Sequence, residues 1–516
     1  MLSSLIYLVI IPLLYSSPCI SVTQNLTATR INCGSTNHSI INGLHYLPDE
    51  NFTSSGLRRA VSFPNLSSPL LTTVRSFPLS VNQKFCYVVP TFRSANYLIR
   101  TTFFYGGVNG PNFPSPPVFY QIVDTTIWTM VNTSADYKRN ATSYYEGVFM
   151  AKGKSISVCL GATNLTDSDP FINTLEVVML TNSIYNSTNF TTHGLSLIAR
   201  HNFGSSNAFI RYPDDKFDRI WEPFDGNMES SNSSSTKTKV DGIWNQPPAA
   251  LFNTAMTSSS ETLAFKWPPL HLPLPNSSYY MALYFAKPDP RIAESNAALD
   301  VAINGVTYYR NMPLTEVGTS VFSGNWSLGG ETTMSLFTAA GSNAAPLING
   351  GELFKVVTLG RRTHTRDVIA LVDIRTRLRN PPADWSSDPC VPREYSWKGL
   401  SCSEGDRVRV VSLDLTGMNV SGTLSPSIAR LTALSDILLG HNKLSGKIPD
   451  LSALKLLRRL HLENNTFSGS IPSSLGGNPF LGELFLQNNN LTGAIPNTIS
   501  GKGINLRVEG NPLLHR

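Results

Sequence analysis

The C-terminal part of the chain carries a pattern that recurs at a nearly constant spacing. The stretch HLENNTFSGSIP at 461–472 is preceded by LLGHNKLSGKIP at 438–449 and followed by FLQNNNLTGAIP at 485–496. A fixed period indicates a repeat architecture, because each unit buries its apolar face against the next one. This feature constrains the fold of the region more tightly than composition does.

From Val410 onward the repeat has the form LxLxxNxLxGxIP, and we interpret residues 409–516 as a leucine-rich repeat solenoid. The paired core residues expected to point inward from each short strand are Leu413 and Leu415, Ile437 and Leu439, Leu460 and Leu462, and Leu484 and Leu486. The residues expected to turn a side-chain amide inward and satisfy open backbone groups are Asn442, Asn465, Asn489 and Asn511, with Met418 at that place in the first repeat. The glycines expected to allow a tight bend are Gly446, Gly469 and Gly493, and the prolines expected on the convex side are Pro449, Pro472 and Pro496.

Outward-pointing strand residues should form the concave face of this solenoid. These residues are Asp414, Thr416, Leu438, Gly440, His461, Glu463, Phe485, Gln487, Arg507 and Glu509. A mixed face with an aromatic ring beside polar groups can hold a peptide or a protein surface, and the alternative is a solvated wall. The predicted ligand-binding residues are His461, Glu463, Phe485 and Gln487.

Residues 363–408 are predicted to join and close the solenoid. The stretch 361–380 has a helical period, and its apolar face is predicted to contain Val368, Ile369, Leu371, Val372 and Leu378. The arginines on the other face could touch an acidic partner, but we favour a solvated helix face. Two prolines then stop the helix, and a disulfide-pinned apolar plug is predicted from Trp385, Trp397, Cys390 and Cys402.

The first 21 residues are predicted to be a secretory signal peptide. Their apolar run, Leu5 to Tyr15, is too short to cross a bilayer and is followed by small residues. No Lys or Arg precedes the run, and a core helix is the alternative. No later run is long and apolar enough for a membrane span. The net charge of +6 with only 15% charged residues does not indicate nucleic-acid binding.

Six cysteines are present, and Cys19 is expected to leave with the signal peptide. In an oxidising compartment Cys390 and Cys402 are the best pair, closing a loop that stabilises the fold by about 3 kcal/mol. The remaining three are Cys33, Cys86 and Cys159, and their pairing stays open. No metal site is expected. The Asn-x-Ser/Thr acceptors for N-glycosylation are Asn25, Asn37, Asn51, Asn65, Asn132, Asn140, Asn164, Asn186, Asn189, Asn232, Asn276, Asn325, Asn419, Asn464 and Asn490.

Residues 25 to about 365 contain many short β-like runs separated by turn residues. Examples are KFCYVVP, SISVCLG, TLEVVML, YYMALYFA, LDVAINGV and LFKVVTL. This pattern predicts a mainly β protein with sandwiches rather than a parallel α/β sheet. The region is too long for one sandwich, and NYLIRTTFFYGG is echoed by YYMALYFAKPDP. We therefore predict two β-sandwich lobes, 25–200 and 201–362.

Enzymatic signatures are weak, and we expect no enzyme and no cofactor. Gly153-Lys154-Ser155 lacks the upstream glycine of a phosphate loop and is interpreted as a β turn. The acidic cluster Asp214, Asp215 and Asp218, together with Arg211 and Arg219, is interpreted as a salt-bridged turn. A glycosidase carboxylate pair is the alternative.

Several stretches of the chain resemble the extracellular part of plant receptor kinases with a malectin-like region and leucine-rich repeats. INCGS, VRSFPL, YLIRTTFFYGG, SVCLG and RYPDDKFDRIWEPF resemble the malectin-like region, and GxIP resembles the plant-specific repeat type. SSDPC resembles the Gly-Asp-Pro-Cys motif of symbiosis-receptor-type kinases, with Ser387 in place of Gly. The resemblance implies tandem malectin-like β-sandwich lobes, a short plant-type solenoid and a receptor-like role. The sequence shows no transmembrane helix and no kinase motifs.

The resemblance to animal malectin raises the question of sugar binding, because malectin grips a glucose disaccharide with aromatic residues and an acid. Aromatic candidates for stacking on a sugar here are Tyr105, Tyr120, Trp128, Tyr284, Tyr308 and Tyr309. The alternative is that these rings belong to the sandwich cores, as aromatic residues of β-sandwiches usually do.

Together these features predict a secreted, non-catalytic recognition protein of the plant apoplast or cell wall. Its expected partners are a peptide, a protein or a cell-wall glycan as ligand, and a membrane receptor kinase that would link it to the plasma membrane. One alternative is a structural carbohydrate-binding module of the cell wall. Another is an inhibitor of wall-degrading enzymes that uses the leucine-rich face.

Overall fold

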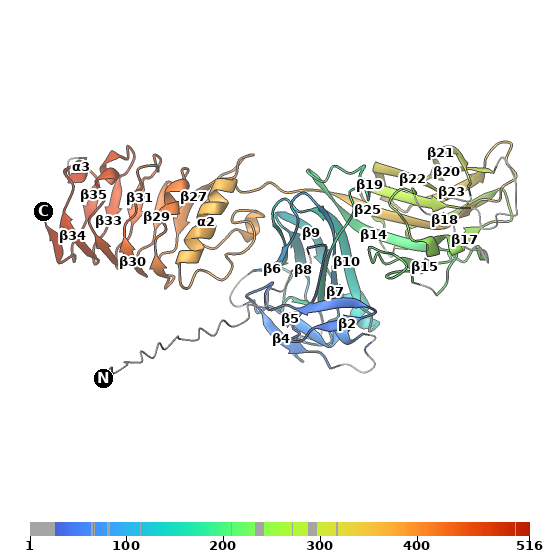
Figure 1. Ribbon diagram of the computed structural model, residues 1–516, viewed down its shortest axis with the longest axis horizontal. Helices are drawn as coiled ribbons and strands as arrows, with labels where there is room; N and C mark the ends of the chain where they lie inside the picture. The colour runs from blue at the N-terminus through green and yellow to red at the C-terminus, as the bar shows by residue number, and fades with distance from the viewer. Residues whose placement is uncertain are drawn as a thin grey trace, which may run out of the picture.

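We describe the chain from a computed structural model. The described residues are 26–515 apart from 63–65, 67, 80–82, 114, 208, 233–241, 271, 287–296, 316–317 and 501. The predicted signal peptide and the acceptors Asn25 and Asn65 lie outside them. Strands dominate, with three short α-helices among the described residues, so the predicted mainly β class is confirmed. The solenoid and two β-lobes follow one another along the long axis of the molecule (Figure 1).

One large sheet runs through both lobes. Its main path contains, in spatial order, β2 (Ser39–Ile41), β3 (Leu44–Pro48), β1 (Ala28–Asn32), β13 (Thr174–Met179), β7 (Asn96–Phe103), β10 (Ser143–Met150), β14 (His193–Phe203), β25 (Gly350–Thr358), β19 (Leu274–Phe285) and β22 (Thr319–Gly330). β15 (Glu222–Phe224) pairs with β14 outside this path. β14 pairs with β10 on one side and with β25 on the other, so it joins the two lobes. The predicted boundary at residues 200 and 201 lies inside this shared strand.

Lobe 1, the part before β14, closes its sandwich with two smaller sheets. Their strands are β6 (Lys84–Pro90), β11 (Ser155–Ala162), β8 (Phe119–Val123) and β9 (Thr126–Val131) in one, and β12 (Phe171–Ile172), β5 (Thr73–Ser76) and β4 (Leu57–Ala60) in the other. Two short helical segments, η1 (Pro69–Leu71) and α1 (Ser134–Lys138), complete the lobe. Stacked and edge-on aromatic rings fill the core, which includes Phe77, Phe103, Phe119 and Phe171.

Lobe 2, which extends from β14 to β25, repeats this layered arrangement. Its smaller sheets are β18 (Thr262–Lys266), β23 (Thr333–Thr338), β20 (Ala298–Ile303) and β21 (Val306–Pro313), and β16 (Glu229–Asn232), β17 (Thr254–Thr257) and β24 (Leu347–Ile348), with η2 (Ala249–Asn253) between strands. The apolar runs quoted from the sequence lie in strands of the two lobes: β6, β11, β13, β19, β20 and β25. These local strand predictions are therefore confirmed.

A ladder of alternating charges is buried along the large sheet. Arg100 on β7 faces Glu176 on one neighbouring strand and Glu146 on the other. Arg100 Nη2 lies 2.8 Å from Glu146 Oε2, and Arg200 Nη1 on β14 lies 2.7 Å from Glu146 Oε1. Arg200 Nε in turn lies 3.3 Å from Glu352 Oε2 on β25. Ion pairs therefore continue from lobe 1 across the shared strand into lobe 2.

The segment 211–221 covers this ladder and supplies the remaining charges. Arg219 Nε lies 2.8 Å from Asp215 Oδ2, and Arg211 Nη2 lies 3.0 Å from Asp218 Oδ2. Asp218 also pairs with Arg100 at 3.2 Å. The predicted salt-bridged turn is thus confirmed for Asp215 and Asp218. Burial alone would raise the pKa of Asp218, but Arg100 and Arg211 outweigh it and hold this pKa below its ordinary value.

The solenoid and its cap share one continuous apolar core. The concave sheet contains β26 (Leu400–Cys402), β27 (Val410–Asp414), β29 (Asp436–Leu438), β31 (Arg459–His461), β33 (Glu483–Phe485) and β35 (Asn505–Arg507). The opposite sheet contains β28 (Ser421–Thr423), β30 (Lys443–Lys447), β32 (Thr466–Gly469), β34 (Asn490–Ala494) and β36 (Leu513–His515). Short helical turns complete the coils and the cap: η3 (Arg393–Tyr395), η4 (Pro426–Arg430), η5 (Ser473–Gly477) and α3 (Asn497–Ser500).

The ladder asparagines make the bonds that the repeat predicts. Asn465 Nδ2 donates to the carbonyl oxygens of Leu439, Leu462 and Glu463, and Asn465 Oδ1 accepts from the Leu444 N–H. Leu439 and Leu444 belong to the preceding coil, so each amide ties one coil to the coil before it. Equivalent bonds to the preceding coil are made by Asn442, Asn489 and Asn511.

The cap contains the predicted helix, but the helix buries a different face. α2 (Thr365–Arg377) buries Ala370, Leu371 and Ile374, whereas Ile369 and Val372 are 53% and 48% exposed. The predicted face is wrong at these two positions because Asp367 turns inward. The Asp367 carboxylate accepts from Arg409 Nε at 2.8 Å and from the Val410 N–H at 3.0 Å. These bonds hold the face of the helix that contains Asp367 against the solenoid.

Two disulfides are present among the described residues. Cys390 and Cys402 are joined in the cap, where Trp385 and Trp397 stack with ring centroids 5.0 Å apart. Cys86 on β6 and Cys159 on β11 lie directly opposite each other and form the second disulfide. Among the described cysteines Cys33 is unpaired, and burial raises the pKa of its thiol. The structure thus settles the pairing that sequence left open.

The cap packs against lobe 1. The Tyr395 hydroxyl donates to the Ala162 carbonyl oxygen at 2.8 Å, and the ring lies against Gly161, where a methyl group would come within 2.7 Å of Tyr395 Cζ. Ser387, in the left-handed region with φ of 60°, places its hydroxyl 2.8 Å from that of Ser157. The Ser387 hydroxyl also donates to the Asp124 carbonyl oxygen. The serine that replaces glycine in the SSDPC stretch therefore contacts lobe 1.

Candidate ligand-binding site

The concave face of the solenoid has three rows of outward-pointing residues. Each row contains the residues at one equivalent position of successive coils, as the register of the parallel strands shows. The first row precedes the core leucine of each strand and contains Ser412, Asp436, Arg459, Glu483 and Asn505. The second row follows that leucine and contains Asp414, Leu438, His461, Phe485 and Arg507. The third row lies two residues further along and contains Thr416, Gly440, Glu463, Gln487 and Glu509.

An aromatic and cationic stack occupies the second row. The His461 and Phe485 rings lie parallel, with centroids 4.2 Å apart and planes 15° apart. The Arg507 guanidinium lies 4.4 Å from the Phe485 centroid. The stacking with each other and with Arg507 holds the rings of His461 and Phe485 in place, and both residues are only partly buried. The stack therefore offers an ordered apolar surface that spans three coils.

The first row holds the stack in place and was missed by sequence reasoning. His461 Nε2 lies 2.8 Å from Glu483 Oε2, and Arg459 pairs with Asp436 on the preceding coil. Burial alone would raise the pKa of Asp436, but the hydrogen bonds from Arg459 and Ser435 and the nearby arginine charges together outweigh it and hold this pKa below its ordinary value. Strand alternation could have revealed this row, because the residue before each inward leucine must also point outward.

Glu463 in the third row is buried without a hydrogen-bond partner. Its side chain lies over Gly440, where a methyl group would come within 2.3 Å of Glu463 Oε1. The residue is 9% exposed, and Oε2 has no partner among the described residues. Gln487 Oε1 on the next coil likewise has no partner in the described part of the chain. Two acceptor oxygens therefore stand on adjacent coils without a donor.

Three of the six predicted sugar-stacking residues are core residues. Tyr105, Trp128 and Tyr284 are 1%, 5% and 0% exposed, so their rings have no open face for a sugar. Their polar atoms are also bonded internally, for example the Tyr284 hydroxyl to Glu352 at 2.9 Å. The prediction is wrong for these three residues because the rings fill the space between sandwich layers.

Two of the remaining three aromatic candidates are partly buried. Tyr120 packs against the cluster around the Cys86–Cys159 disulfide, and Tyr308 stands edge-on to Trp326 with centroids 4.7 Å apart. Tyr309, the sixth candidate, is 47% exposed on β21. Tyr120 lies in lobe 1 with Tyr105 and Trp128, whereas Tyr308 and Tyr309 lie in lobe 2 with Tyr284, so the six rings do not form one site.

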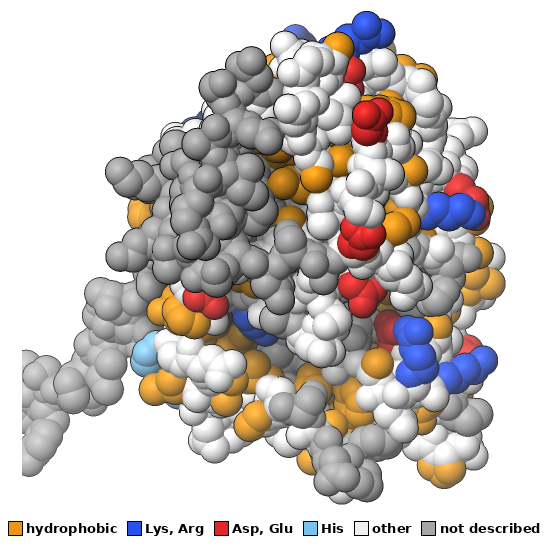
Figure 2. Space-filling model, turned by 90° about the vertical axis from the view of Figure 1, so that its right-hand side faces the viewer, with side chains coloured by type: hydrophobic (Ala, Val, Ile, Leu, Met, Phe, Trp, Pro, Cys, Tyr) orange, Lys and Arg blue, Asp and Glu red, His pale blue; other side chains and the backbone are white. Residues whose placement is uncertain are grey.

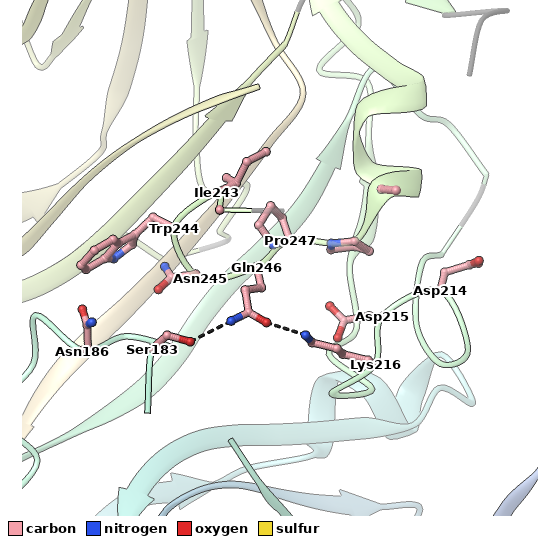
Figure 3. Close-up of a pocket in the computed structure, with 13 residues that line it drawn as sticks. Ser183, Asn186, Asp214, Asp215, Lys216, Ile243, Trp244, Asn245, Gln246 and Pro247 are labelled. Carbon is pink, nitrogen blue, oxygen red and sulfur yellow. Dashed lines mark hydrogen bonds between the residues drawn. The ribbon is translucent and has the colours of Figure 1, made fainter. Parts of the chain in front are cut away.

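A cavity of about 590 Å³ lies where loops of the two lobes meet (Figure 3). Gln246 lies between two of its lining residues, with Gln246 Nε2 donating to the Ser183 hydroxyl and Lys216 Nζ donating to Gln246 Oε1. Gln246 therefore links Ser183 to Lys216 in this part of the cavity wall. In the view of Figure 2, acidic and basic side chains lie among apolar and uncharged ones, and several adjoin a side chain of the opposite charge.

Most of the predicted glycan acceptors can be reached from solvent. Eleven of those whose side chains are described are exposed: Asn37, Asn51, Asn132, Asn140, Asn164, Asn186, Asn189, Asn276, Asn325, Asn419 and Asn490. Nothing is described for the side chain of Asn232. Asn464 differs because it is partly buried and bonded on both sides: Asn488 Nδ2 donates to its Oδ1 at 2.8 Å, and its Nδ2 lies 3.3 Å from His441 Nε2.

Within the described ranges, no helix is long and apolar enough to cross a membrane. In the same part of the chain, no group of three or more His, Cys, Asp or Glu side chains is placed to hold a metal ion.

Comparison with known proteins agrees with this architecture. A model of the malectin-like domain matches residues 31–356, and a model of the leucine-rich repeat matches residues 456–478. A receptor-like protein kinase of Arabidopsis thaliana is 29% identical over 406 residues, covering 77% of this chain and 44% of the kinase. A leucine-rich repeat receptor-like serine/threonine-protein kinase of the same plant is 30% identical over 408 residues, covering 76% and 45%. The chain thus spans less than half the length of these relatives.

Solved structures share the fold of the lobes. The ANX2 ectodomain from Arabidopsis thaliana superposes with a TM-score of 0.53 at 17% identity, covering 64% of this chain and 97% of that one. The structure of the peptide RALF23 in complex with FER and LLG2 gives a TM-score of 0.52 at 16% identity, covering 64% and 95%. At these identities the likeness concerns the fold alone. Since the family model matches more than half of the sequence, and the lobes have the ectodomain fold, this chain belongs to the malectin-like domain family.

Proposed function

We propose that this protein is a non-catalytic recognition module of the plant extracellular space, and that the concave face of its solenoid binds a peptide or an extended protein segment. The observation that carries the proposal is the stack of His461, Phe485 and Arg507, which is ordered, partly exposed and spread over three coils. Aromatic residues such as Phe, and arginine, are enriched in protein interfaces relative to the rest of the surface.

The lobes are proposed to support recognition rather than catalysis. Asp215 and Asp218, which a glycosidase would need as free carboxylates, are each paired with an arginine in the buried charge network. The burial of Tyr105, Trp128 and Tyr284 gives no support to a sugar site built on these rings. A role as a wall carbohydrate module is therefore less favoured than peptide recognition.

The relatives supply the context of the proposal. The matched Arabidopsis thaliana proteins are named as receptor kinases, and the FER structure contains a peptide together with a second protein, LLG2. We propose that this chain is secreted and likewise works with a membrane receptor kinase. It would either bind the ligand for the kinase or contact a ligand that the kinase also contacts.

The proposal is tested by selecting peptides from a random 12-residue display library on the secreted, full chain. Selected peptides should bind saturably, and Phe485→Ala should weaken binding by about tenfold or more because it removes the centre of the stack. Phe337→Ala is the matched control, since Phe337 is 40% exposed on β23 of lobe 2. If no peptide is selected, or if Phe485→Ala binds as tightly as the unmodified chain, the proposal fails. Saturable binding on a glycan array by the full chain would instead favour the wall-module alternative.

A further inference from the structure

We infer that the ligand of the concave face is basic, and that one of its guanidinium or ammonium groups pairs with Glu463 beside Gln487. This inference rests on the proposed function, because it names the chemistry of the ligand that the same face would bind. It concerns the third row, whereas the proposed function rests on the aromatic stack of the second row.

The first argument is the missing donor. Glu463 is 9% exposed, and Gln487 is partly buried. Glu463 Oε2 and Gln487 Oε1 are both shielded from solvent, and neither has a hydrogen-bond partner in the described part of the chain. A buried carboxylate is costly unless it is paired and hydrogen-bonded. A carboxylate can only accept, so its partner must bring N–H or O–H groups. Strands of one sheet lie about 4.8 Å apart, so one forked donor can reach side chains of adjacent coils.

The second argument is the charge of the face. The three rows contain five carboxylates and two arginines, although the whole chain has a net charge of +6. Asp436 is already paired with Arg459 of the first row, and Glu483 contacts His461 of the second row. The other three carboxylates of these rows have no ion pair with a described residue: Asp414, Glu463 and Glu509. The face is therefore acidic on a basic protein, and it complements a cationic ligand.

The third argument is geometric. Gly440 has no side chain, so the Glu463 carboxylate can lie directly against the chain at this point of the concave surface. The neighbouring second row offers the Phe485 ring and the methylene stem of Arg507 as an apolar wall. A long basic side chain suits this combination, because its stem packs on apolar surface while its head meets a carboxylate. A divalent cation does not suit it, because such an ion needs several oxygen ligands and no group of three candidate metal-binding side chains lies in the described part.

The test is a positional peptide array probed with the secreted, full chain, in which one position is fixed in turn as Arg, Lys, Gln or Glu. The array should show preference for Arg or Lys at one position, and binding should weaken as salt is raised. Glu463→Gln should reduce affinity for the basic peptides by about tenfold or more, as expected for a lost charge-assisted hydrogen bond. Glu331→Gln is the matched control, because Glu331 is an exposed carboxylate of lobe 2 that pairs with Lys266.

A second variant separates the charge from its position. Gly440→Ala keeps every charge but places a methyl group 2.3 Å from the present position of Glu463 Oε1, so the carboxylate must move. It should weaken selection for Arg and Lys while leaving the contribution of Phe485 intact. Peptides that bind through Phe485 without preference for a basic residue would overturn this inference and leave the proposed function standing. The absence of any peptide binding would overturn both.

Discussion

Asn464 and Asn465 are neighbours in the chain but have different structural roles. Asn465 points into the solenoid, where its amide joins two coils. Asn464 points outward with a φ of 53°, a conformation that asparagine tolerates better than most residues. The same outward position in the coils before and after holds His441 and Asn488, with φ of 57° and 56°. The residues at this outward position therefore share a left-handed backbone conformation.

The hydrogen bonds of Asn464 lead to a prediction about glycosylation. A glycan on Asn464 Nδ2 would remove a hydrogen from the atom that faces His441 and would have to fit at a partly buried site. We expect lower occupancy at Asn464 than at the neighbouring acceptors Asn419 and Asn490, which are exposed. Mass spectrometry of glycopeptides from the secreted protein measures the occupancy. Equal, full occupancy at all three acceptors would contradict the prediction.

His201 in lobe 2 leads to a prediction about pH. Trp267 Nε1 donates to His201 Nδ1 at 3.0 Å, which requires that nitrogen to be unprotonated. Burial lowers the pKa of His201 to about 4. The unfolded pKa is about 6.5, so the folded state favours the neutral ring and gains full stability only above that pH. As pH falls from 6.5 toward 4, the contribution should be lost, by about 2 kcal/mol at pH 5.

The measurement is urea unfolding at pH 7.5 and pH 5.0, followed by tryptophan fluorescence. The variant His201→Gln cannot titrate, so its stability should change less between the two pH values than that of the unmodified chain. Because other groups also titrate, the difference between the two proteins is the quantity of interest. The same pH response in both proteins would exclude His201 as the cause.

At the scale of the element, one coil of the solenoid is stable only against the next. The strands of the concave sheet are three to five residues long, and each coil depends on its neighbour for backbone partners as well as for apolar contact. A ladder asparagine contributes to both the backbone bonding and the packing, because it lies among the core leucines and bonds to two coils.

Asn465→Ala is therefore predicted to loosen the solenoid locally. It would leave the Leu444 N–H and three carbonyl groups without the side-chain partner, at a cost of about 1–3 kcal/mol for each group that water does not reach. Hydrogen exchange of peptides from 439–467 should become faster, while the lobes stay unchanged. Asn505→Ala, at an exposed position of β35, is the control and should have little effect. Unchanged exchange in Asn465→Ala would show that water replaces the amide.

At the scale of the whole molecule, two features make the parts act together. The shared strand β14 and its ion pairs join lobe 1 to lobe 2, and the Tyr395 contact joins lobe 1 to the cap of the solenoid. The core of the solenoid continues into the cap without interruption. The concave face is therefore held in a defined orientation relative to lobe 1.

The Tyr395 contact can be opened by a small change in lobe 1. Gly161→Ala would place a methyl group 2.7 Å from Tyr395 Cζ, so the ring must leave its position. We expect small-angle X-ray scattering to show a larger radius of gyration, because the solenoid gains freedom relative to the lobes. Gly153→Ala is the matched control, since its nearest neighbouring atom would lie at 3.8 Å. An identical scattering curve for Gly161→Ala would mean that the orientation depends on other contacts.

The sequence determined the local structure of this protein wherever a short-range pattern carries the physics. The repeat of leucine, asparagine, glycine and proline specifies the coils, because each of these residues meets a need within one coil or its neighbour. The short alternating runs likewise specified the strands of the lobes. The three rows of the concave face can be partly predicted from the sequence for the same reason, since strand alternation tells which residues point outward.

The tertiary structure alone decided what depends on distant partners. Only the fold shows that Tyr105 and Tyr284 are core residues, because an aromatic ring has the same local pattern in a core and in a sugar site. The pairing of Cys86 with Cys159 needed the register of β6 and β11. The inward turn of Asp367 needed Arg409, 42 residues away in the chain. The unpartnered Glu463 could not be foreseen either, because a missing hydrogen bond becomes visible only when all neighbours are in place.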